Sequence, residues 1–255
     1  MFDRDTDAVT LSHDEHDRIR SASLVKLMIA LDYFENHSAY NPICAQDKVT
    51  LESMLRSSDD NAASELWVRQ GCEKIVERVV AKLGLHDTGP PADRRFWGYT
   101  PTSAADAVAV YRYILDSTHP TVRGFIMSNL RQATRCASDG FDQSFGIPSV
   151  IAGSAYKQGW SRFGAPQNPC TQPKQPRADI GAAKDGPLDL VQALVTDVDL
   201  THPAMHTTGT YANDRNIAAL LTLQPDNTDW GTSATHVTQL VRDIYKHTES
   251  QPAGE

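Results

Sequence analysis

The sequence predicts an α+β fold, and three observations support this class. Segments with apolar residues at helical spacing fill the chain between about residues 23 and 136. Segments rich in strand-forming residues and separated by turn residues follow after residue 139. A last apolar-periodic segment closes the chain over residues 237–245. Helices that precede a C-terminal sheet and its closing helix are typical of α+β proteins.

Five helices are expected in the first part of the chain. Leu24–Phe34 carries apolar residues at helical spacing and predicts a buried amphipathic helix. A second helical stretch runs from about Leu51 to Val68, and a third from Ile75 to Leu83, where Gly84 supplies a C-cap. The other two are expected over Ser103–Leu115 and Thr121–Leu130.

Three strands are expected in the second part. They begin with Ser154-Ala155-Tyr156-Lys157 and continue with Met205–Tyr211 and Asn216–Leu223 as antiparallel neighbours. The connection Ser161–His202 is rich in Pro, Gly, Ala and Asp and is too long for an ordinary hairpin loop. We therefore predict an excursion with a short helix near Leu188–Val195.

Length and composition favour one domain. The 255 residues are close to the size at which single cores stop growing, and 40% of them are hydrophobic against 22% charged. We interpret residues 1–255 as one domain. Residues 1–22 and 137–255 form its sheet-containing lobe, residues 23–136 its mostly helical lobe, and residues 161–204 an inserted excursion.

The charge and the apolar pattern exclude several partners. A formal charge of −8 repels phosphate backbones and anionic lipid headgroups, so nucleic acid is a poor partner. No run approaches the roughly 18 apolar residues that a membrane span needs. The N-terminal residues lack a signal-peptide pattern, so the chain as written is expected in the cytoplasm, or exported if its start has been clipped.

No metal or cofactor is expected. The four cysteines, Cys44, Cys72, Cys136 and Cys170, lie far apart without a CxxC motif, so a zinc site is improbable and up to two disulfides can form. Their pairing stays open. The segment His13-Asp14-Glu15-His16 is interpreted as a solvated turn rather than a metal site.

The first candidate for chemistry is the pair Ser23 and Lys26. Residues three apart on a helix share a face, so Lys26 can reach the Ser23 hydroxyl. Burial among Leu24, Leu27 and Met28 disfavours a charged lysine, and a neutral amine can activate the serine. Free N–H groups at the helix start suit a developing oxyanion. The alternative is that this serine only caps the helix, which is the commoner use of the residue type.

The segment Ser154-Ala155-Tyr156-Lys157 has the same S-x-x-K spacing and serves as an internal control. It is expected on a strand, where residues three apart point to opposite faces. This second copy therefore cannot form the pair.

Two further motifs follow in order. Ser58-Asp59-Asp60 lies in the second helical stretch, and Lys157-Gln158-Gly159 lies on the first predicted strand. Together with the first pair they resemble the S-x-x-K, S-D-N and K-T-G motifs of the penicillin-recognising serine enzymes, the β-lactamases and penicillin-binding proteins. The resemblance extends from about Phe2 to Tyr245. Segments such as Lys157-Gln158-Gly159-Trp160 resemble an actinobacterial branch of these enzymes.

The resemblance implies a β-lactamase-like fold, with an antiparallel sheet flanked by helices and an inserted all-helical subdomain. It also implies that the usual N-terminal helix and most of the first strand are missing before Phe2. In the family the N-terminal and C-terminal helices cover one sheet face together. We therefore expect apolar area beside the closing helix, at Val237, Leu240, Val241 and Ile244, and self-association through that face.

The resemblance also implies the roles of the site residues. Ser23 is expected to be the acylated nucleophile, Lys26 its base, Ser58 the proton relay, and Lys157 a positive charge. The backbone N–H groups of Ser23 and Trp160 are expected to form the oxyanion hole. The expected substrate-binding residues are Asp60, Gln158, Gly159 and Trp160.

Three departures from the family pattern affect the expected chemistry. Asp60 stands where the family has Asn, although a slip of one residue would place Asp59 and Asn61 in the motif, and this register stays open. Gln158 replaces the usual Thr or Ser, and an ionised Asp60 repels anions, so penicillins are expected to bind poorly. Residues 87–98, where class A β-lactamases carry their deacylating Glu, contain no Glu.

We therefore expect a serine hydrolase or acyltransferase that acts through an acyl-serine intermediate on an amide or ester. Its activity would be like that of a D,D-peptidase or a weak β-lactamase, on a small-molecule or peptide-like substrate. The alternative is a catalytically degenerate binding protein of the same fold. An intact Ser23–Lys26 pair favours catalysis, because a degenerate site does not need a buried lysine beside a serine.

Overall fold

A five-stranded antiparallel sheet forms the centre of the molecule. The computed structural model describes residues 1–36, 43–170, 181–186 and 198–249. The strand order is β2-β1-β7-β6-β5, and β3 and β4 form a separate two-stranded sheet. The bounds are β1 (Phe2–Asp3), β2 (Ala8–Val9), β3 (Ile19–Arg20), β4 (Pro101–Thr102), β5 (Ala155–Ser161), β6 (Ala204–Tyr211) and β7 (Asn216–Leu223).

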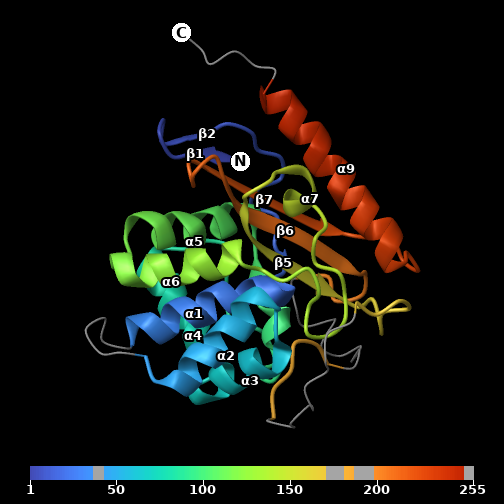
Figure 1. The fold of residues 1–255 in the computed structure, drawn as a ribbon. Helices are drawn as coiled ribbons and strands as arrows, with labels where there is room; N and C mark the ends of the chain where they lie inside the picture. Colours follow the sequence, from blue (N-terminus) through green and yellow to red (C-terminus); the bar gives the residue numbers. More distant parts are fainter. Residues whose placement is uncertain (37–42, 171–180, 187–197, 250–255) are drawn as a thin grey trace.

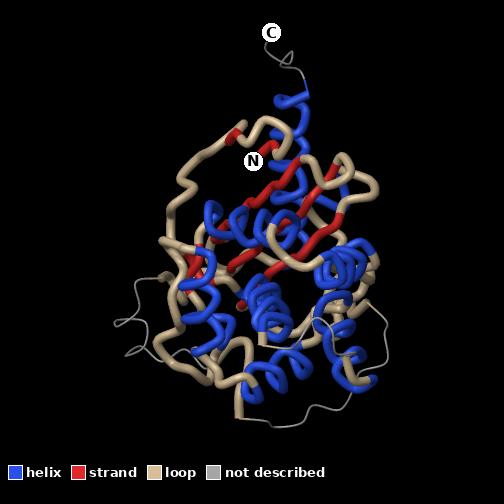
Figure 2. Tube along the Cα trace, turned by 90° about the vertical axis from the view of Figure 1, so that its left-hand side faces the viewer, coloured by secondary structure: helices blue, strands red, loops and turns tan. Residues whose placement is uncertain are grey.

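Helices cover both faces of this sheet (Figure 1). Helices α1 to α6 lie on one side, and the closing helix α9 lies on the other, where the short helix α7 packs against it (Figure 1). In Figure 2 the strands run diagonally across the molecule, with helices in front of and behind them. The helices are α1 (Val25–Glu35), α2 (Ala45–Arg56), α3 (Asp60–Arg69), α4 (Lys74–Leu83), α5 (Ala104–Asp116), α6 (Pro120–Arg131), α7 (Ile147–Val150) and α9 (Trp230–Glu249), and the 3₁₀ helices are η1 (Ala22–Leu24) and η2 (Trp97–Tyr99).

The three predicted strands are confirmed, and so is the antiparallel pairing of the last two. Lys157 on β5 lies opposite Thr208 on β6, and Gly159 lies opposite His206. All of β5 and β6 is buried, although β5 is an edge strand of the sheet. A sheet covered on both faces leaves no solvated side, which explains why these strands are not clearly alternating in sequence.

The first helix differs from the amphipathic helix that its sequence predicts. Every residue of α1 from Val25 to Phe34 is buried, including Asp32. The helix packs against α2, α3, α4 and α5, so no face is left for solvent. The Arg78 guanidinium contacts both carboxylate oxygens of Asp32 at 2.7 Å, which compensates the buried charge.

The predicted single helix over Leu51–Val68 is also wrong, because α2 ends at Arg56 and α3 begins at Asp60. Ser58 between them has a φ of +53°, in the left-handed region that few side chains adopt. Asp59 is extended and accepts hydrogen bonds from the N–H groups of Asn61 and Ala62, so it caps α3. The break places the second motif at a helix start.

The other expected helices are found as α4, α5, α6 and α9. Gly84 ends α4 with a φ of +66°, and Ser103 caps α5 by accepting from the N–H of Asp106. The short helix expected near Leu188–Val195 lies outside the described residues. The division into two lobes and an excursion stays a prediction.

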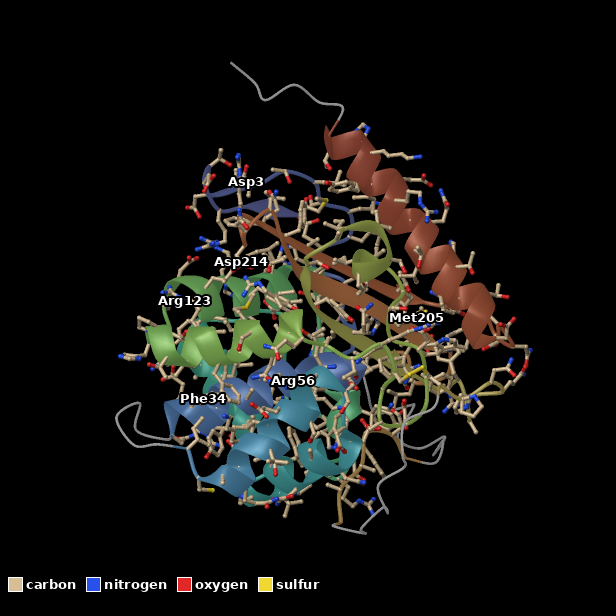
Figure 3. All side chains as sticks on the ribbon, viewed as in Figure 1. Asp3, Phe34, Arg56, Arg123, Met205 and Asp214 are labelled. Carbon is tan, nitrogen blue, oxygen red and sulfur yellow. A yellow bond between two sulfur atoms is a disulfide. The ribbon has the colours of Figure 1, made fainter. Side chains whose placement is uncertain are left out.

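An aromatic cluster joins the start of α9 to the sheet. Trp230 stacks on Phe141 with ring centroids 4.1 Å apart and meets Trp160 edge-on at 5.4 Å. Met205 is fully buried in the same cluster, and Figure 3 shows it on the sheet beside α9. A disulfide joins Cys136 to Cys170, which settles one of the pairings left open, and Cys44 and Cys72 are free thiols.

Candidate active site

Ser23 lies inside the 3₁₀ helix η1, one turn before α1. The residue before it, Ala22, has a φ of +46°, which is uncommon for a residue with a side chain. Leu24 is the N-cap of α1, and no side chain caps that end. Ser23 therefore does not serve as the helix cap. Strained backbone of this kind is concentrated at functional sites.

Lys26 lies one turn further along and points back to Ser23. Its Nζ is 3.1 Å from Ser23 Oγ, 2.6 Å from the backbone oxygen of Ser58 and 2.7 Å from Asp60 Oδ1. The ammonium also lies over the Trp97 ring, 4.9 Å from its centroid. The predicted Ser–Lys contact is thus present in the structure.

Ser58 links the two lysines of the predicted site. Its Oγ is 3.2 Å from Lys26 Nζ and 2.7 Å from Lys157 Nζ. The left-handed backbone at Ser58 turns both its carbonyl and its hydroxyl toward Lys26. A proton can therefore pass from Ser23 to Lys26 and on to Ser58 through groups in hydrogen-bond contact.

The register of the second motif follows from these contacts. Asp60 reaches Lys26, whereas Asp59 is used to cap α3. The structure thus places Ser58 and Asp60 in the site. This is the first of the two registers that the sequence left open, and the other would have used Asp59 and Asn61. Ser154, the serine of the control copy, precedes β5, and its spacing partner Lys157 reaches Ser58 instead.

The candidate catalytic side chains are shielded from solvent. The exposed fraction of Ser23 and Lys26 is 0%, that of Lys157 is 1% and that of Ser58 is 2%. Burial lowers the pKa of Lys26, a shift that the Asp60 carboxylate opposes and the charge of Lys184 reinforces. Burial, with the nearby charge of Lys26, also holds the pKa of Lys157 well below its ordinary value. A lowered pKa favours the neutral amine, which is the form that can act as a base.

The third motif lies on β5, close to η1. A Cβ at Gly159 would be 2.9 Å from the backbone oxygen of Ser21 and 3.2 Å from Leu24, so only glycine lets β5 approach η1 this closely. Trp160 is turned into the aromatic cluster, where its Nε1 donates to Asp139 Oδ2 at 2.9 Å.

The Gln158 side chain is held away from the lysine network. Its Nε2 donates to the backbone oxygens of Phe145 at 2.5 Å and Gln143 at 3.3 Å, and the side chain is fully buried. Its Oε1 is buried without a hydrogen-bond partner among the described residues. The structure thus brings together Ser23, Lys26, Ser58, Asp60 and Lys157. The Gln158 amide is bonded to the backbone of residues 143 and 145 instead.

Sequence reasoning did not identify Lys184, which reaches the site from the long connection between β5 and β6. Its Nζ is 3.3 Å from Asp60 Oδ2 and 3.6 Å from Asp139 Oδ2, and it lies 5.2 Å from the centroid of the Trp160 ring. Nothing in the local sequence marks this lysine. The length of the connection was the one available signal.

Two carboxylates of residues 87–98 are used for local contacts. Asp87 Oδ2 accepts from Ser103 Oγ and lies 2.8 Å from His16 Nδ1, while Asp93 pairs with Arg95. Asp60 is the carboxylate in contact with Lys26. Burial raises the pKa of Asp60, but the charges of Lys184 and Lys26 outweigh burial and hold that pKa below its ordinary value. It is therefore a weak base.

The described residues contain no group of three metal-ligating side chains, and none of the helices described among them has the length and apolar character of a membrane span.

No known family model matches the chain. A protein designated lipoprotein LppW is 38% identical over 151 residues in Mycobacterium tuberculosis and in Mycobacterium bovis. The match covers 56% of this chain, and the chain spans about half the length of these relatives, 47%.

Solved structures of class A β-lactamases match nearly the whole chain. The enzyme of Mycobacterium abscessus superposes with a TM-score of 0.62 and 15% identity, covering 98% of this chain and 92% of its own. The TLA-3 extended-spectrum β-lactamase gives 0.65 and 13%, covering 97% and 90%. A β-lactamase from Chitinophaga pinensis gives 0.63 and 11%, covering 97% and 92%. Identities this low establish the architecture alone, and the chain has a β-lactamase-like fold.

Proposed function

We propose that the protein is a serine hydrolase or acyltransferase that forms an acyl intermediate on Ser23. The observation that carries this proposal is the contact of Lys26 Nζ with Ser23 Oγ at 3.1 Å, inside a buried network that continues through Ser58 to Lys157. A serine in contact with a buried lysine is an activated nucleophile. The β-lactamase-like fold supports the same conclusion.

In the acylation step, Ser23 Oγ forms a bond to the carbonyl carbon and its proton passes to Lys26 Nζ. The oxyanion is held by the backbone N–H groups of Ser23 and Trp160. When the tetrahedral intermediate collapses, the bond to the leaving nitrogen or oxygen breaks, and Ser58 delivers a proton to that atom. Lys26 resupplies Ser58 across 3.2 Å, and Lys157 keeps the Ser58 hydroxyl oriented.

The substrate is an amide or ester of a small molecule or peptide, like that of a D,D-peptidase or a weak β-lactamase. We assign substrate binding to Asp60 and to the backbone of Gly159 and Trp160, since the Trp160 side chain is turned into the aromatic cluster. Gln158 acts indirectly, because its amide holds the backbone of Phe145 and Gln143. The carboxylate of Asp60 disfavours an anionic substrate group beside it.

Intact-mass analysis with a fluorophosphonate probe and with benzylpenicillin tests this function. We expect one adduct per chain, lost in Ser23→Ala and retained in Ser154→Ala, which removes the serine of the control S-x-x-K copy. Labelling that survives Ser23→Ala contradicts the assignment.

One observation favours the second candidate, a binding protein that has lost turnover. Ser23 has no exposed surface, so a substrate carbonyl reaches it only after the site opens. Absence of any adduct, together with retained binding of benzylpenicillin by calorimetry, would identify this alternative.

A further inference from the structure

Lys184 belongs to a short segment that lies against the 3₁₀ helix η2, and we name residues Gly181–Gly186 the strap. The strap is part of the connection between β5 and β6. Its backbone pairs with the chain at η2, because Trp97 N–H donates to the Ala183 oxygen at 3.1 Å and Gly98 N–H donates to the Lys184 oxygen at 2.9 Å. These bonds fix the position from which the Lys184 side chain enters the site.

Two glycines show that the strap and η2 fit closely. A Cβ at Gly98 would lie 2.4 Å from the Lys184 oxygen, and its three nearest atoms all belong to Lys184. A Cβ at Gly186 would lie 2.4 Å from the Phe96 ring. Tyr99 also accepts a hydrogen bond from Gly186 N–H at 3.0 Å and donates to the Gly186 oxygen at 2.9 Å. The two glycines thus let the strap and η2 approach each other at positions where a Cβ would clash.

The Asp60 carboxylate bridges two lysines as a result. Its Oδ1 is 2.7 Å from Lys26 Nζ, and its Oδ2 is 3.3 Å from Lys184 Nζ. The Lys184 side chain is 11% exposed, and Asp139 is its second acidic neighbour at 3.6 Å. Burial disfavours the charged form of Lys184, but the attraction of Asp60, Asp139 and Asp185 outweighs burial and holds its pKa above the ordinary value. Lys184 is therefore a permanent positive charge at the site.

We propose that Lys184 is a positioning residue for the Ser23–Lys26 pair, because it shares the Asp60 carboxylate and prevents Asp60 from acting as the counter-ion of Lys26 alone. This inference rests on the function proposed above. An ammonium holds its proton when it is 2.7 Å from a carboxylate that no second cation shares. A protonated Lys26 cannot accept a proton from Ser23. The strap is thus part of the proposed active site.

The groups that face Lys26 come from every side of the site. The uncharged ones are the hydroxyls of Ser23 and Ser58 and the ring of Trp97. The ones that can be charged are Asp60 from α3, Lys157 from β5, Lys184 from the strap and Asp139 from the segment before β5. Removing Lys184 deletes one positive charge and leaves both acids in place, so the pKa of Lys26 must rise.

The rate of Ser23 acylation by a neutral fluorophosphonate, measured against pH, tests this role on the full chain. Lys184→Met keeps most of the side-chain volume and removes the charge. In its plot of acylation rate against pH, we expect the rising acidic limb to lie roughly one pH unit higher than in the unaltered protein. At a given pH on that limb the rate is then roughly tenfold lower, and the rate on the alkaline plateau changes little. Lys184→Arg should restore the limb.

Gly98→Ala provides a second, independent variant, because the three atoms nearest to its methyl group all belong to Lys184. We expect it to displace Lys184 and to move the acidic limb as Lys184→Met does. Gly124→Ala, at a helical glycine with nothing within 4 Å of a Cβ, is the matched control and should leave the limb unchanged. A lower plateau with an unmoved limb, or a faster reaction at every pH, would overturn the proposal and leave the strap as a structural cover.

A readout without acylation separates this proposal from the proposed function. The Lys26 Cε signal in ¹³C-lysine-labelled protein, assigned with Lys26→Arg, reports the titration of Lys26 directly. Its midpoint should move to higher pH in Lys184→Met and Gly98→Ala. An unmoved midpoint rejects the role of Lys184, whereas a missing Ser23 adduct in the unaltered protein rejects only the proposed function.

Discussion

Lys157 Nζ donates a hydrogen bond of 2.7 Å to Ser58 Oγ, and this bond ties β5 to the turn between α2 and α3. The same hydroxyl lies 3.2 Å from Lys26 Nζ. A single serine thus holds two buried lysines whose charged forms repel each other. The arrangement is costly for structure alone, because buried charges are retained chiefly where they are paired or functional.

Lys26→Ala should lower the rate of Ser23 acylation by about 10³-fold, since removal of a general base returns the hydroxyl to its unactivated state. The rate is obtained by quenching the reaction at a series of times and measuring the acylated fraction by intact mass. Ser57→Ala removes a hydroxyl next to the motif that donates to the Ser53 oxygen, and it should behave like the unaltered protein. Comparable rates for Lys26→Ala and the unaltered protein would show that another group is the base.

Asp60→Asn should speed acylation by benzylpenicillin roughly tenfold on the alkaline plateau, because it removes a negative charge beside an anionic substrate. It should also move the acidic limb to lower pH. The carboxylate favours the protonated form of Lys26, so its loss lowers the pKa of Lys26 further. A neutral fluorophosphonate should show the shift of the limb without the gain on the plateau. An equal gain for both probes would contradict the charge argument.

A β-lactam adduct on Ser23 should persist. Hydrolysis of the acyl-enzyme needs a base that activates water, and the segment 87–98 carries no Glu while Asp60 is a weak base between two lysines. Turnover of a chromogenic cephalosporin beside the lifetime of the adduct measures this. Sustained turnover above roughly 1 s⁻¹ would reveal a base that the site as described does not explain.

His206 should make the protein less stable as the pH falls from 6.5 to 4. Burial of the imidazole lowers its pKa to about 4, so in this range the unfolded chain binds a proton that the folded chain does not. The free energy of unfolding should fall by about 3 kcal/mol across that window, with no further loss from this group below it. Urea unfolding at several pH values measures it.

The variant His206→Gln should lose less stability than the unaltered protein over the same range. His236→Gln, at an exposed position on α9, is the control and should keep the full dependence. Parallel stability curves for the unaltered protein and His206→Gln would show that other groups cause the loss.

Self-association through the face beside α9 stays a prediction, and the structure narrows the surface. Val237 and Val241 are buried, whereas Ile244 lines a cavity of about 240 Å³ together with Val9 and Leu11. Val9 is 64% exposed, and such apolar surface favours association. Val9→Asp should convert a dimer to a monomer in sedimentation, and Val49→Asp, equally exposed on α2, should not. A monomer at every concentration tested contradicts the prediction.

The sequence by itself determined most of the fold, and it named five residues that the structure brings together, which are Ser23, Lys26, Ser58, Asp60 and Lys157. Apolar spacing located the helices α4, α5 and α6, and turn residues located β6 and β7, because these patterns reflect local geometry. Apolar spacing also located α1, although that helix is buried on every side rather than on one face. The same reasoning failed at Ser57–Asp59, where a cap divides one apparent helix into two.

Only the tertiary structure decided how the site is charged. The register of Ser58 and Asp60, the close approach of Gly159 to η1 and the disulfide between Cys136 and Cys170 all depend on which distant segments meet. Lys184 is the clearest case, since it lies 124 positions from Asp60 in the chain yet shares its carboxylate with Lys26. Contacts between distant segments leave no periodicity in the sequence, because they are set by the packing of whole elements rather than by local backbone preference.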